Sequence, residues 1–135
     1  MKSTRHSRMW ILPMLVVVLF GVGSCGFVNV DESPITVVTY KPSGPGGDDA
    51  LLQGVLATVD GCLVVEEIDA VVVPLLPANK VRYTRNGGIR LFGVTYHLGD
   101  TVSFGGGFTS RFNDFVIPQE CEQIVATSPL FIAWN

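Results

Sequence analysis

Three cysteines, Cys25, Cys62 and Cys121, carry the most reactive side chains of this 135-residue chain. A thiol can take a lipid, pair in a disulfide, bind a metal or act as a nucleophile. A nucleophilic role is disfavoured, because no suitable histidine accompanies Cys62 or Cys121; His6 lies near the N-terminus, and His97 is the only other histidine. An odd number of cysteines also leaves at least one without a partner in the same chain.

His97 and the carboxylates give no catalytic constellation. No second histidine accompanies His97, so we expect a surface histidine on a strand. Asp100 and Glu120 are a conceivable carboxylate pair for glycoside hydrolysis, but nothing in the sequence favours it. Asp60 and Asp100 neighbour turn glycines, and we expect their side chains to cap those turns. No catalytic residue is assigned.

Two further clusters resemble ligand sites only superficially. Gly105–Gly107 is not followed by the Lys-Ser/Thr pair of a phosphate-binding loop, so we expect a bulge or a wide turn there. Glu66, Glu67 and Asp69 offer oxygen ligands, but their spacing matches no calcium loop and indicates a solvated turn. The sequence therefore predicts no cofactor and no metal.

Arginines interleave with aromatic residues in one stretch, which is typical of surfaces that bind nucleic acid or oligosaccharide. The stretch contains Arg82, Tyr83, Arg85, Arg90, Phe92 and Tyr96. Strand alternation, however, predicts that Tyr83 and Tyr96 point into the core while Arg82 and His97 point outward. We therefore expect no nucleic-acid partner, and glycan binding stays a secondary interpretation.

The N-terminal 24 residues have the layout of a signal peptide. Basic residues fill the segment 2–8, an uncharged apolar run covers 9–22, and small residues follow. A membrane-spanning helix needs about 20 apolar residues, and this run is shorter and contains Pro13. We expect residues 1–24 to be removed and the rest to be exported.

Val22–Gly23–Ser24–Cys25 resembles the lipobox of bacterial lipoproteins. The resemblance implies a diacylglycerol on the Cys25 thiol and cleavage just before it, so that the protein is anchored at the outer face of the cell membrane. Two alternatives remain: an ordinary signal peptide cut near Ser24, or an uncleaved anchor. All three place the remainder of the chain outside the cytoplasm.

Lipidation of Cys25 leaves Cys62 and Cys121 as one pair, and exported compartments permit disulfides. We expect this disulfide; two buried reduced thiols are the alternative. Charge gives no further anchor, because three of the nine basic residues and none of the twelve acidic residues precede Cys25. The exported part is therefore mildly acidic, and membrane attachment is expected to depend on the lipid alone.

Residues 25–50 read as the lipidated cysteine and a flexible tether, since Pro, Gly, Ser and Asp dominate two stretches of it. The strand-forming segment 35–40 between them is left either paired at a sheet edge or simply extended. Residues 51–135 read as one all-β domain, of a length that suits a barrel of five to seven short strands. Nine segments have strand character: 51–59, 62–66, 70–73, 81–85, 89–91, 94–98, 101–104, 124–126 and 130–134.

Several turns and one helical turn separate these strands. Asp60–Gly61 and Asn86–Gly87 favour tight primed turns, Pro74 and Pro77 are expected to end the strand before them, and residues 118–123 favour one helical turn. Such spacing of short strands predicts a small closed or partly open barrel.

Four motifs of this domain resemble small actinobacterial lipoproteins of unassigned role, whose domain looks OB-like. They are Gly61–Cys62–Leu63, Val71–Val72–Val73–Pro74, the stretch 96–102 and Gly105–Gly106–Gly107. The resemblance implies a fold and no activity. We expect a non-catalytic envelope lipoprotein that binds a protein or a glycan; the alternative is a small secreted hydrolase of envelope glycan or peptide.

Overall fold

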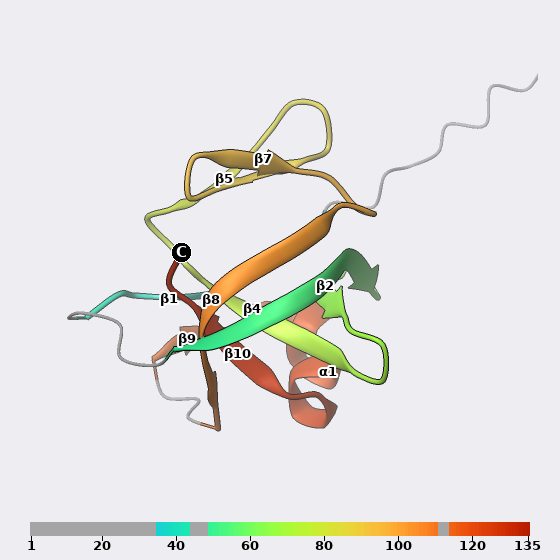
Figure 1. Cartoon of the computed structure of the whole chain (residues 1–135), viewed down its shortest axis with the longest axis vertical. Coiled ribbons are helices and arrows are strands. Elements are labelled where there is room, and N and C mark those ends of the chain that lie inside the picture. The colour runs from blue at the N-terminus through green and yellow to red at the C-terminus, as the bar shows by residue number, and fades with distance from the viewer. Residues whose placement is uncertain (1–34, 44–48, 111–113) are drawn as a thin grey trace, which may run out of the picture. The chain divides into compact units, whose positions relative to one another are not determined.

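Five strands close on one another into a mixed β-barrel (Figure 1). The computed structural model describes residues 35–43, 49–110 and 114–135, all within the compact unit Asp31–Asn135. The predicted signal peptide (1–24) and the predicted lipid site at Cys25 lie outside the described residues. The barrel strands are β2 (Ala50–Val59), β3 (Cys62–Glu66), β4 (Val71–Pro77), β8 (Thr101–Thr109) and β10 (Leu130–Ala133).

The barrel has OB-like topology, which confirms the predicted fold class. β2, β3 and β4 form an antiparallel meander, β8 pairs antiparallel with both β2 and β10, and β10 closes the barrel by pairing parallel with β4. Counting barrel strands in chain order, the order around the barrel is 1-2-3-5-4. Every barrel strand therefore has two hydrogen-bonded neighbours, and no long edge is left open.

The tight turn predicted at Asp60–Gly61 joins β2 to β3. Val59 pairs with Cys62, and the two turn residues have φ of 51° and 86°. Both residues of a type I′ turn need positive φ, which aspartate tolerates and glycine prefers.

The tether predicted for residues 25–50 contains part of the sheet. β1 (Val38–Tyr40) lies parallel to β4 and antiparallel to the two-residue strand β9 (Phe115–Val116). Thr36 also bridges to Cys62. Of the two alternatives for residues 35–40, the structure shows pairing with the sheet. Val38 and Tyr40 are buried because their side chains pack against the outer surface of the barrel.

A separate three-stranded sheet covers part of the barrel core. It consists of β5 (Val81–Tyr83), β6 (Ile89–Leu91) and β7 (Val94–Tyr96), and Figure 1 shows it above the barrel strands. Val81, Ile89 and Leu91 join the barrel's inner cluster around Leu52, Phe104 and Phe131. We call this sheet the cap.

The outer face of the barrel is buried where the C-terminal helical segment lies. The 3₁₀ turn η1 (Gln119–Cys121) leads directly into α1 (Glu122–Thr127). Cys121 and Val125 pack against a second cluster that contains Cys62, Val64, Val73 and Leu75. β3 and β4 are therefore apolar on both parities because both of their faces are covered. Within the described ranges, no helix is long and apolar enough to cross a membrane.

Four predictions about local structure are wrong. Residues 124–126 lie in α1 rather than in a strand, since the run between Pro118 and Pro129 buries only Cys121 and Val125, which are four residues apart as on one face of a helix. Asn86–Gly87 belongs to a five-residue loop, because Tyr83 pairs with Ile89; the tight turn is at Phe92–Gly93, where Leu91 pairs with Val94.

The other two concern strand length. β4 continues through Pro74 to Pro77. On one side of β4, the pairing with β3 ends at Val72 and the pairing with β1 begins only at Leu75. Pro74 lies between these two pairings, so the missing N–H of proline breaks no hydrogen bond of the sheet on that side. Gly105–Gly107 forms neither a bulge nor a turn; it lies inside β8, in register with both β2 and β10.

Candidate functional site

Two hollows flank the side chain of Trp134, just after β10. The first has a volume of about 460 Å³ and is lined by Tyr40, Lys41, Ser43, Thr109, Asp114, Phe115, Ile132 and Trp134. The second, of about 620 Å³, is lined by Asp49, Ala50, Leu51, Gly105, Gly106, Trp134 and Asn135. We call this pair of hollows the Trp134 site.

The backbone of Trp134 is fixed by an extension of the β10–β8 pairing. The Trp134 N–H donates to the carbonyl of Gly105 at 2.8 Å, and the Gly105 N–H donates to the carbonyl of Asn135 at 3.1 Å. A Cβ at position 105 would meet only the Asn135 side chain, so the pairing depends on these backbone hydrogen bonds. The sheet therefore holds Trp134 in place.

Tyr40 fixes the indole ring from the other side. The two rings meet edge to face, with centroids 5.9 Å apart and planes at 89°, and such pairs contribute about 0.5–1.5 kcal/mol beyond their burial. The buried Tyr40 hydroxyl donates to the carbonyl of Ala133 at 2.8 Å. β1 thereby ties the wall of the Trp134 site to β10, so the indole is preorganised.

The indole N–H of Trp134 is buried and has no acceptor among the described residues. A buried donor without a partner costs about 1–3 kcal/mol. A ligand that displaces the atoms covering this N–H and brings a carbonyl or hydroxyl oxygen to it would recover that cost. Lys41 and Asp114 add one charge of each sign to the lining of the first hollow. The arrangement suits a ligand with an apolar face and several polar groups.

Alkaline pH should test the burial of Tyr40. Burial raises the pKa of the Tyr40 hydroxyl above its usual value of 10.0. The hydroxyl therefore loses its proton at a higher pH in the folded protein than in the unfolded chain. Its contribution to the free energy of unfolding is fully present below pH 10 and is lost as the pH rises through the folded pKa. We expect the free energy of unfolding to fall above pH 10 less steeply in Tyr40→Phe than in the wild type.

Urea unfolding at pH 7 and at several alkaline pH values measures both parts of this effect. At pH 7, Tyr40→Phe should be less stable by about 1 kcal/mol, because the carbonyl of Ala133 loses its donor. Equal alkaline slopes in the two proteins would contradict a buried, hydrogen-bonded hydroxyl.

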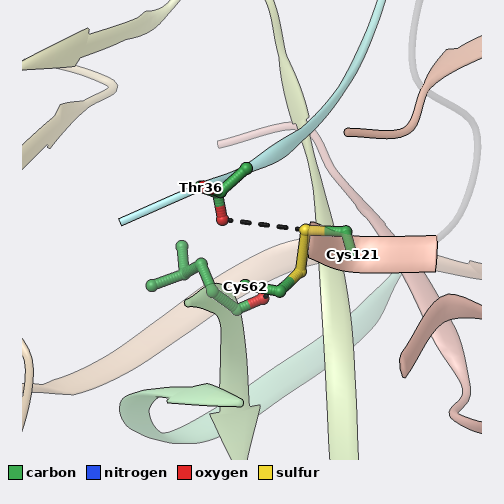
Figure 2. The surroundings of a disulfide bond; sticks show 4 residues. Thr36, Cys62 and Cys121 are labelled. Atoms are coloured by element: carbon green, nitrogen blue, oxygen red, sulfur yellow. Dashed lines mark hydrogen bonds between the residues drawn. A yellow bond between two sulfur atoms is a disulfide. The ribbon is translucent and has the colours of Figure 1, made fainter. Parts of the chain in front are cut away.

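The disulfide predicted between Cys62 and Cys121 is present, with an S–S distance of 2.03 Å and Cα atoms 5.0 Å apart (Figure 2). Both residues are fully buried. The carbonyl oxygen of Thr36 lies 3.9 Å from the Cys121 sulfur, along the dashed line in Figure 2, and accepts a hydrogen bond from the Leu63 N–H at 2.8 Å. The disulfide thus joins β3, η1 and the segment before β1.

His97 and Asp100 belong to one exposed turn between β7 and β8. The Asp100 carboxylate accepts a hydrogen bond from the His97 backbone N–H at 2.8 Å, whereas its distance to the His97 ring nitrogen Nδ1 is 4.0 Å. Both side chains are about half exposed. His97 is a surface residue, as predicted, and Asp100 caps the turn, also as predicted. Glu120 lies in η1 and is exposed.

The remaining predicted sites are scattered. Glu67 to Ala70 form the turn between β3 and β4, closed by a hydrogen bond from the Glu67 N–H to the Ala70 carbonyl at 2.8 Å. In the described part of the chain, no three His, Cys, Asp or Glu side chains gather as a metal site would require. Tyr96 packs against Phe104 in the core as predicted, but Tyr83 is 61% exposed.

Sequence reasoning missed the Trp134 site entirely. Tyr40 and Trp134 are 94 positions apart, and β1 and β10 are brought together by their shared neighbour β4. The only sequence signal was an aromatic residue at the end of a predicted closing strand. No protein-family model, curated protein or solved structure matches the chain. Its function therefore has to be inferred from its own geometry.

Proposed function

We propose that this protein is a lipid-anchored module of the bacterial cell envelope that binds a ligand without turning it over. One observation carries the location: the buried disulfide uses Cys62 and Cys121, so Cys25 is the one cysteine of the sequence left for another purpose. It follows an apolar run and two small residues, where a lipoprotein carries its lipid. Disulfides also persist in exported proteins and are rare in the cytoplasm.

The binding part of the proposal rests on the Trp134 site. OB-folds commonly bind ligands over their second and third barrel strands. Here that outer surface is covered, since Cys62, Val64, Val73 and Leu75 are completely buried beneath other elements. The Trp134 site lies elsewhere and offers an orphaned donor beside aromatic rings. A glycan or a short peptide has the acceptor oxygens and apolar faces that such a site would recognise.

Intact mass tests the anchor. Protein extracted by detergent from its host membrane should begin at Cys25, carry a diacylglycerol and gain two hydrogens on reduction. An unmodified chain beginning at or after Cys25 would indicate a freely secreted protein, and the full-length mass would indicate an uncleaved anchor. Either result would overturn the lipid-anchored part of the proposal.

Trp134 itself reports on the binding part. Trp10 lies in the predicted signal peptide, so Trp134 is the only tryptophan expected in the processed chain. We expect its fluorescence to change on titration with peptidoglycan fragments, each a disaccharide bearing a short peptide, which should be recovered uncut. Trp134→Phe keeps an aromatic ring but removes the N–H, and should weaken binding about tenfold by calorimetry, since a hydrogen bond contributes about 0.5–1.5 kcal/mol.

Phe108→Leu is the matched control, because Phe108 is an exposed aromatic residue outside both hollows. It should leave affinity unchanged. Equal affinity of wild type and Trp134→Phe would remove the Trp134 site from consideration, and cleavage of the fragments would favour a hydrolase.

A further inference from the structure

The positive charge of the described domain is concentrated on the cap. Lys80, Arg82, Arg85 and Arg90 are all exposed, and the only other described basic residue is Lys41. The sequence contains no acidic residue between Asp69 and Asp100. The described residues outside the cap include nine Asp and Glu. The domain therefore has one basic end on an otherwise acidic body.

Two of these arginines lie opposite each other, and although the Arg82 guanidinium donates a hydrogen bond to the carbonyl of Val81 at 2.7 Å, neither arginine has a carboxylate partner among the described residues. Arg82 is directly opposite Arg90 in the β5–β6 register, and Arg90 is opposite Thr95 in β7. All three side chains are exposed on the outer face of the cap. Like charges at opposed positions destabilise a sheet, and no carboxylate forms an ion pair with either arginine in the described ranges. An anion bound between them would remove the repulsion.

The first described residues of the domain lie beside the β5–β6 hairpin of the cap. Ile35 and Thr36 line a hollow of about 410 Å³ together with Tyr83, Thr84, Gly87 and Gly88 of the β5–β6 hairpin. Ile35 is ten positions after Cys25, and ten residues span at most about 36 Å even when fully extended. A lipid on Cys25 would keep the cap close to the bilayer surface.

We propose that the cap docks on the anionic phospholipid headgroups of the membrane that holds the anchor, with Arg82 and Arg90 as the central pair. This inference rests on the proposed lipid anchor. A basic residue near an anionic surface contributes about 1 kcal/mol, which corresponds to about fivefold in the docked population. The acidic body is repelled by the same surface, so the domain stands with the cap toward lipid.

Hydrogen exchange on the membrane-attached protein tests the docking. The protein is purified from its host membrane and placed in nanodiscs of phosphatidylcholine alone or of an equal mixture with phosphatidylglycerol. We expect the amides of residues 80–90 to exchange more slowly in the anionic discs, and high salt to abolish the difference. Arg82→Gln/Arg90→Gln should reduce the docked population about 25-fold. Lys41→Gln, which removes a charge outside the cap, should leave the docked population unchanged, whatever its effect on ligand binding at the Trp134 site.

The double variant should fold at least as well as the wild type without lipid, because it removes the opposed charges; its melting temperature serves as the check. Equal exchange in the two discs would overturn the proposal, as would protection of residues 66–70 in place of 80–90. Protection of the cap by single-stranded DNA but not by anionic discs would assign the surface to nucleic acid instead. Failure of the anchor and failure of the docking can be told apart. The intact mass shows whether the diacylglycerol is present, and the comparison of the two lipid compositions shows whether the cap docks.

Discussion

Removing the Cys62–Cys121 disulfide should cost the protein about 4 kcal/mol of its free energy of unfolding. The two cysteines are 59 positions apart, and the chain-entropy model gives about 4 kcal/mol for closing a loop of this length in the unfolded state. Both side chains are completely buried, so the bond also holds η1 against β3 at a place where water does not enter. A natural domain typically loses about 2–5 kcal/mol when such a bond is removed.

The double variant Cys62→Ala/Cys121→Ala provides the measurement, because it leaves no unpaired thiol. Urea unfolding of this variant should show a much lower midpoint, and reduction of the wild type should shift its midpoint in the same direction. Cys25→Ser is the control, since Cys25 takes no part in the bond. A double variant as stable as the wild type would show that packing of α1 holds this side of the barrel without the covalent link.

Gly106→Ala should destabilise the barrel by about 3 kcal/mol, near the upper end for an overpacked core. Gly106 is buried in β8 opposite Ala133 of β10. A Cβ at this position would collide with the carbonyl of Ile132 and lie 2.8 Å from a ring carbon of Phe131. Neither neighbour can move easily, because one is the backbone of the paired strand and the other is a fully buried ring.

The adjacent residue supplies the matched control. A Cβ at Gly105 would collide only with the side chain of Asn135, which is exposed and can rotate away. Gly105→Ala should therefore cost well under 1 kcal/mol by the same urea unfolding, although both glycines lie in the same strand. Similar losses in the two variants would mean that strand flexibility, rather than close approach of β10, explains these glycines.

The fold class followed from the sequence because its signals are local. Alternating residues, the Asp60–Gly61 turn and apolar runs between glycines are read within a few positions, and these elements are present as predicted. The errors arise where a distant strand decides the outcome. Pro74 lies within β4 because of where β3 stops and β1 starts, and Gly106 lies within β8 where β10 approaches it closely.

Tyr83 shows the same limit at the level of one side chain. Alternation assigned it to the core face of β5, and it does share that face with Val81. The core ends at Val81 and Ile89, however, so Tyr83 extends past it beside Ile35. The opposed arginines and the Trp134 site likewise depend on pairings between elements, which periodicity within one segment does not reveal. The disulfide pairing was predictable because only two cysteines remained.

The parallel pairing of β10 with β4 constrains the order in which the barrel can fold. Val73 of β4 pairs with Leu130 of β10, so one edge of β4 and one edge of β8 stay unpaired until the last barrel strand has been synthesised. Long-range pairings of this kind form slowly, because loop closure must be achieved before the contact stabilises anything. During that interval the apolar edge Val71–Leu76 is open to strands of other chains. A truncation that removes residues 130–133 would leave these edges of β4 and β8 unpaired permanently, and the closed barrel would become an open sheet prone to aggregation.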